Sequence, residues 1–116
     1  SMKQDHDFEG VYFTLGKLSI YQFNKFYDVA GINGLRLFQY IRTKQGLIPR
    51  GDPGNQKPTS WILVDNHNLE KWFGVHPPQK WVSLVKLEEA KLIEVNRKGT
   101  GKCPLVRIIC PEKVLH

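Results

Sequence analysis

Two short helical patterns flank the sequence Gly74-Val75-His76-Pro77-Pro78, and this arrangement restricts the fold more than any other feature of the chain. Asp65 is a good N-cap for a helix over 66–73, and Gly74 ends that helix. A proline is tolerated at the first helical position, so a second helix begins near Pro77 and runs to about Lys91. The sequence therefore predicts two helices joined by a turn of three or four residues.

Extended segments lie on both sides of this helix pair. Residues 59–64 are rich in β-branched and aromatic side chains and predict a strand. Residues 92–97 and 104–110 are two further β-rich runs, separated by Lys98-Gly99-Thr100-Gly101-Lys102. This last pattern predicts a hairpin with a glycine-rich, cationic tip.

The N-terminal part of the chain predicts two more helices. Residues 11–18 read as a short extended segment, and Ser19-Ile20-Tyr21-Gln22 fits a capping box that opens a helix over about 19–30. Gly31 and Gly34 interrupt the pattern, and a second helix is predicted over about 34–45. Residues 49–58 contain three prolines and two glycines, so we expect a loop there.

The 116 residues fit one domain of α+β class, mostly α. Residues 1–10 are expected to be a flexible N-terminus, in which Ser1-Met2 looks like a tag-cleavage scar before a start methionine. The domain is expected to span 11–110, with an N-terminal strand and helix over 11–31 and a core over 34–110. Residues 111–116 are expected to form a tail.

The net charge of +6 favours an anionic partner such as nucleic acid. Residues 97–107 carry four basic side chains and no acid, and residues 36–58 carry five basic side chains against one acid. Cys103 and Cys110 lie too far apart on one extended segment to form a disulfide. We therefore expect reduced thiols and a cytoplasmic location.

From residue 34 onward the chain resembles the winged helix-turn-helix DNA-binding superfamily, as found in bacterial and phage regulators and replication initiators. The resemblance rests on Leu69–Val75, on Leu87–Ile93 and on the hairpin tipped by Arg97-Lys98-Gly99. It implies a three-helix core with a C-terminal β-hairpin wing, to which this chain adds an N-terminal helix. Many members of the superfamily have a glycine where this chain has Lys91.

The resemblance implies binding of double-stranded DNA through a recognition helix over about 77–91 and a basic wing over 92–110. Side chains near the start of such a helix meet base edges in the major groove. Gln79, Ser83 and Lys86, together with Val82, are expected on one exposed face. Lys80 is expected to lay its stem on the core with its ammonium emerging beside the DNA. The wing is expected to place Arg97, Lys98 and Lys102 against phosphates.

Other readings of the same residues remain open. The polar helix face and the basic hairpin tip can simply be solvated surface. A winged helix can also be a protein-interaction module, here through the apolar helix surface around Trp81 and Val82. Trp61 and Trp72 are expected to point inward. Four aromatic residues of the N-terminal helix either complete the core or form a homodimer interface: Tyr21, Phe23, Phe26 and Tyr27.

The sequence gives no sign of an enzyme, a metal site, a cofactor or a membrane span. Glu88 and Glu89 are adjacent on a helix and point about 100° apart, so they do not form a catalytic pair. The histidines lack cysteine or carboxylate partners at zinc-ligand spacing. No run of about 18 apolar residues occurs. Our expectation is a transcription or replication regulator without catalytic activity.

Overall fold

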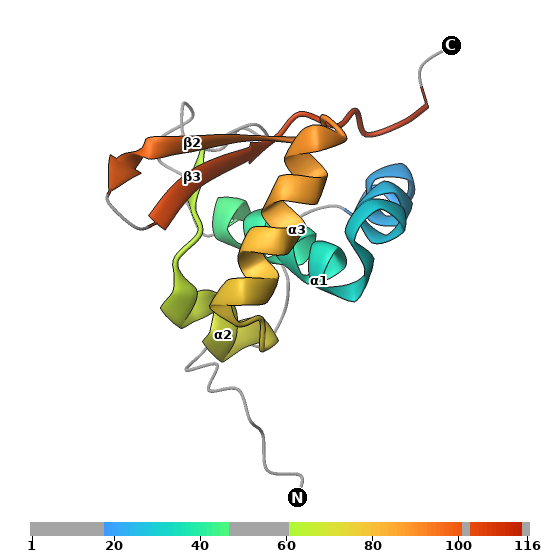
Figure 1. The fold of residues 1–116 in the computed structure, drawn as a ribbon. Coiled ribbons are helices and arrows are strands. Elements are labelled where there is room, and N and C mark those ends of the chain that lie inside the picture. Colours follow the sequence, from blue (N-terminus) through green and yellow to red (C-terminus); the bar gives the residue numbers. More distant parts are fainter. Residues whose placement is uncertain (1–17, 47–60, 101–102, 115–116) are drawn as a thin grey trace, which may run out of the picture.

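The computed structural model describes residues 18–46, 61–100 and 103–114, and for residues 98–100 it describes the backbone alone. The described part is α+β and mostly helical, as predicted, with three helices and a three-stranded antiparallel sheet (Figure 1). The elements are α1 (Ile20–Gly46), β1 (Ile62–Leu63), α2 (Asn66–Phe73), α3 (Pro77–Glu89), β2 (Ile93–Thr100) and β3 (Cys103–Ile108). The predictions made for 1–17, 47–60, 101–102 and 115–116 lie outside the described residues.

The first helical region bends at Gly31, which confirms the predicted interruption. Gly31 has φ 66° and ψ −153°, a left-handed φ that favours glycine, and α1 therefore consists of two helical segments. Gly34 is buried, and a Cβ atom there would lie 2.8 Å from the carbonyl oxygen of Phe26. A residue without a side chain is thus required where the second segment passes the first.

The helix pair that the sequence predicts is present. Asp65 caps α2 by accepting a hydrogen bond of 2.7 Å from the amide of Asn68, and Gly74 forms the left-handed C-cap. The third helix begins at Pro77 and ends at Glu89, two residues earlier than expected. Lys91 follows with φ 62°, so a non-glycine residue occupies the left-handed conformation that favours glycine. In Figure 1, α2 lies beside the N-terminal end of α3.

The three strands form a sheet in the order β1-β3-β2, and both pairs are antiparallel. The predicted hairpin is confirmed, with Val95 opposite Val106 and an irregular register between Asn96 and Thr100. The strand predicted over 59–64 is only two residues long within the described part. Trp61 is exposed rather than inward, because the register places it beside Arg107, whose guanidinium carbon lies 4.8 Å from the indole centroid.

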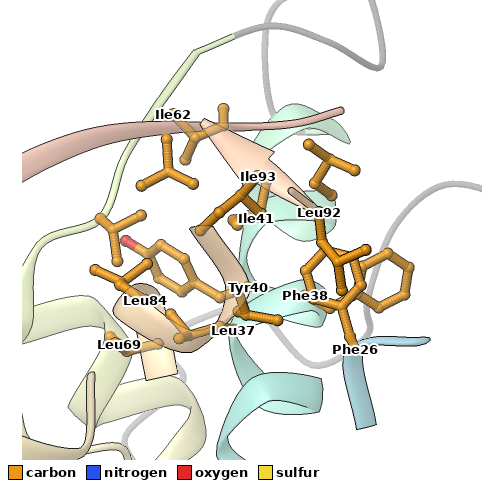
Figure 2. Close-up of a cluster of buried hydrophobic side chains, with 14 of the residues drawn as sticks. Phe26, Leu37, Phe38, Tyr40, Ile41, Ile62, Leu69, Leu84, Leu92 and Ile93 are labelled. Carbon is orange, nitrogen blue, oxygen red and sulfur yellow. The ribbon is translucent and has the colours of Figure 1, made fainter. Parts of the chain in front are cut away.

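The core lies between α1, α3 and the inner face of the sheet (Figure 2). Phe26 is fully buried, and its ring centroid lies 4.8 Å from that of Phe38. Tyr21 and Phe23 are half-buried against the same cluster, whereas Tyr27 is 52% exposed. The first segment of α1 therefore completes the core, and Phe26 is not available for a dimer interface. Dimerisation through this helix stays a prediction and would rely on Tyr27.

Polar side chains attach the first segment of α1 to the end of the chain. The backbone N–H of Gln22 donates a hydrogen bond of 3.1 Å to Ser19 Oγ, which caps the start of α1. The Gln22 side chain does not complete the predicted capping box. Its Nε2 donates to the carbonyl of Cys110 and its Oε1 accepts from Arg42, both at 2.7 Å. A side chain assigned to a local cap thus serves a tertiary contact.

Both cysteines are free thiols, as expected from their spacing. Cys110 is buried and Cys103 is half-buried. Across the described ranges, no helix has the length and apolar character needed to cross a membrane.

Candidate nucleic-acid interface

The outward face of α3 carries most of the side chains that the sequence assigned to it. Gln79 and Lys86 are exposed, and Val82 between them is 56% exposed. Gln79 Oε1 accepts a hydrogen bond of 3.1 Å from the backbone amide of His76, so the side chain is held at the start of the helix. Together Gln79, Val82 and Lys86 form what we call the outer face of α3.

Ser83 does not belong to this face. It is buried, and it lies in the stripe that α3 turns toward the core with Lys80, Leu84 and Leu87. These four positions follow the i, i+3, i+4, i+7 spacing of a buried helix face. The prediction for Ser83 was wrong because a small hydroxyl residue is tolerated within such a stripe, and residue type alone did not reveal it.

Lys80 is fully buried, so its ammonium does not emerge beside a ligand as predicted. Its Nζ donates to the carbonyl of Val64 at 3.1 Å and to Oδ1 of Asn66 at 2.6 Å. These bonds join α3 to the junction between β1 and α2. Burial lowers the pKa of Lys80, while the charges of Cys103 and Asp65 raise it by less. Lys80 is therefore a structural residue of the helix pair.

Substitution of Lys80 by methionine is expected to change how stability depends on pH. Burial lowers the pKa of this lysine in the folded protein, so the unfolded chain binds more protons as the pH approaches 10. The lysine's contribution to the free energy of unfolding therefore rises with pH. The free energy of unfolding of the parent should therefore rise relative to that of K80M between pH 7 and pH 10.

Urea denaturation followed by circular dichroism at several pH values measures this difference. K86M is the matched control, because it removes an exposed lysine from the same helix. If the difference in the free energy of unfolding between the parent and K80M changes with pH no more than the difference for K86M does, Lys80 does not have a lowered pKa in the folded protein.

Arg97 of β2 joins the hairpin to the end of α3. Its Nη1 and Nη2 donate to the two carboxylate oxygens of Glu88 at 3.2 and 2.9 Å. Its guanidinium carbon lies 6.0 Å from the centroid of the Trp81 ring. The hydrogen bond from Arg97 lowers the pKa of Glu88, so this carboxylate is ionised at neutral pH. Arg97 is exposed, as predicted for a wing residue, but its charge is paired.

Trp81 contacts two cations. It is half-buried, and the Nζ of Lys80 lies 5.2 Å from its ring centroid in addition to the contact with Arg97. The sequence assigned Trp81 to a partner surface, whereas its ring is half-buried and lies beside Arg97 of β2. Of the other predicted wing residues, the side chain of Lys98 and the whole of Lys102 lie outside the described residues.

The role of Glu88 as the ion-pair partner of Arg97 was not predicted from the sequence. Glu88 was considered only as half of an excluded catalytic pair with Glu89. The signal lay in a carboxylate on the last turn of a helix and an arginine nine positions later in the following strand. Another such pair links His76 Nδ1 to the carboxylate of Glu70 at the turn between α2 and α3.

Within residues 18–46, 61–100 and 103–114, no three His, Cys, Asp or Glu side chains come together as a metal site. The outer face of α3 presents an exposed amide, an exposed valine and an exposed lysine. Comparison of the chain with protein-family models, with curated proteins and with solved structures finds no significant match.

Proposed function

We propose that this chain is a winged-helix domain that binds double-stranded DNA, with α3 in the major groove and the β2–β3 hairpin as the wing. The element order from the second segment of α1 onward is helix, strand, helix, helix, hairpin, and β1 pairs with β3. This order supports the winged-helix assignment. The observation that carries the DNA-binding proposal is the direct contact between Arg97 of the hairpin and α3 beside its outer face.

The roles of the outer face follow from what each side chain offers. Gln79 presents an amide that can pair with the N6 and N7 edge of adenine, and Val82 offers a methyl surface for thymine. Lys86 supplies a cation for a backbone phosphate. In this proposal base contacts come from Gln79 and Val82, and affinity comes from Lys86 and the wing.

Electrostatics support a polyanionic partner. The whole chain carries a net charge of +6, and the hairpin stretch 97–107 contributes four basic residues and no acid. Basic side chains that neutralise phosphates release counterions and give salt-dependent affinity. A role in transcription or replication is proposed on the same basis.

A second candidate function is a protein-interaction module. Val82 and Val85 are 56% and 41% exposed on the same side of α3, and this apolar character is unusual for a surface that only contacts phosphates. In this alternative the valines contact a partner protein, and the basic hairpin contributes only to solubility.

Fluorescence anisotropy with a labelled random duplex across a series of salt concentrations tests the proposal. We expect micromolar binding at low salt and a log–log slope of several units, at about 0.9 per phosphate contact. Absence of binding even at low salt would reject DNA binding by this domain and favour the protein-partner alternative.

A further inference from the structure

Arg97 binds the carboxylate of Glu88 with the geometry that an arginine also uses to bind a phosphate. Both terminal nitrogens of the guanidinium donate to the two carboxylate oxygens, in the bidentate arrangement that arginine also forms with phosphate. The guanidinium carbon also lies 6.0 Å from the centroid of the Trp81 ring, a cation–π contact that does not use the N–H groups of Arg97. Arg97 therefore has a carboxylate partner and a second contact that does not depend on that carboxylate.

The pair lies beside the outer face of α3. Trp81, Val85 and Glu88 are spaced i, i+4 and i+7, so they form a row along the helix next to Gln79, Val82 and Lys86. Arg97 reaches this row from β2. A DNA backbone that follows α3 into the groove passes along this junction of helix and hairpin in the proposed binding mode.

We propose that Glu88 occupies, in the free protein, the place that a DNA phosphate takes on Arg97 in the complex. This exchange rests on the proposed DNA-binding function, and it would regulate the affinity of the same surface for DNA. Glu88 then limits affinity, because its carboxylate must leave Arg97 before the phosphate can pair with it. Arg97 keeps its contact with Trp81 in both states, so only its anionic partner changes.

Exposure makes this exchange feasible. The side chains of Arg97 and Glu88 are 47% and 36% exposed, so water can solvate the carboxylate once it is released. Exposed ion pairs contribute little to stability, in contrast to pairs that are closed off from solvent. The low pKa of Glu88 keeps the carboxylate ionised at neutral pH, where it repels an approaching phosphate until it is displaced.

The test compares E88Q with the parent in the anisotropy measurement on the random duplex. Glutamine keeps the size of the side chain and one acceptor for Arg97, but it removes the charge. We expect E88Q to bind about three- to tenfold more tightly at about 50 mM salt, because a surface ion pair of this strength no longer has to be broken. The salt slope should stay nearly unchanged, because Arg97 pairs with a phosphate in both complexes.

Two further variants separate this mechanism from a general charge effect. E89Q makes the same change at the neighbouring exposed carboxylate, for which no ion pair occurs within the described residues, and it should raise affinity by less than E88Q. In the R97Q background, E88Q should give no more gain than E89Q, because the arginine that it releases is absent. Thermal melting by circular dichroism checks that every variant is folded.

Each result decides the question. A larger gain for E88Q that vanishes in the R97Q background supports the exchange. Equal gains for E88Q and E89Q, or a gain that persists with R97Q, would overturn it in favour of a simple charge effect. Weaker binding by E88Q would show that the pair only positions the hairpin. If the parent itself fails to bind DNA, the proposed function fails, and the exchange fails with it.

Discussion

Replacing Phe26 by alanine is expected to lower the free energy of unfolding by about 3–5 kcal/mol, the usual cost of removing a large aromatic side chain from a core. Phe26 is fully buried and packs against Phe38, so its loss leaves a cavity between the first segment of α1 and the rest of the domain. Since small domains are stable by only about 5–15 kcal/mol, much of the stability would be lost. Urea denaturation followed by circular dichroism measures the change.

Tyr27 provides the matched control for this prediction. It is the next residue on the same helix and is 52% exposed, so Y27A should cost less than about 1 kcal/mol in a monomer. If F26A costs no more than Y27A, the first segment of α1 is not part of the core. If Y27A is instead the costly substitution and its effect depends on protein concentration, this helix forms a homodimer interface.

Reversing the three charges of the wing, as R97E/K98E/K102E, is expected to weaken binding to all DNA sequences by about 10²–10³-fold at about 50 mM salt. Each lost phosphate contact removes about one unit from the salt slope and about tenfold in affinity at this concentration. Anisotropy with several unrelated duplexes measures both quantities. Binding as tight as that of the parent at about 50 mM salt would show that the hairpin is not a wing.

Two comparisons make this experiment specific. Because Glu88 faces Arg97, the R97E change also places two carboxylates together, so the neutral triple variant R97Q/K98Q/K102Q is measured beside it. Q79A is the contrasting variant on the outer face of α3, and it should alter the preference among duplexes while leaving the salt slope nearly unchanged. Uniform weakening by Q79A would contradict base reading by this residue.

Local signals in the sequence predicted the boundaries of the helix pair well. Asp65 and Gly74 act on backbone groups within one helical turn, and the structure shows both as caps of α2. The break at Gly31 follows from the backbone preference of glycine, and the pairing of β2 with β3 follows from two short β-rich runs. These features depend only on residues that are close in sequence, so a short segment is enough to predict them.

Side-chain environments were predicted less well where the partner comes from a distant element. Gln22 was assigned to a local cap, but it bonds to Cys110 and Arg42, which are 88 and 20 positions away. Trp61 was expected inside, but the pairing of β1 with β3 turns it outward beside Arg107. In each case the decisive contact is set by how elements pack rather than by the local pattern.

Capping, turn chemistry and helical periodicity are local, so they were enough to predict the helix pair, the hairpin and the outward positions of Gln79, Val82 and Lys86. The burial of Lys80 and Ser83 and the pairing of Arg97 with Glu88 depend on how distant segments pack, so they were found in the structure alone. The reason is physical: a buried polar side chain is stabilised by its hydrogen-bond partners, and for Lys80 these are Val64 and Asn66 in another part of the chain.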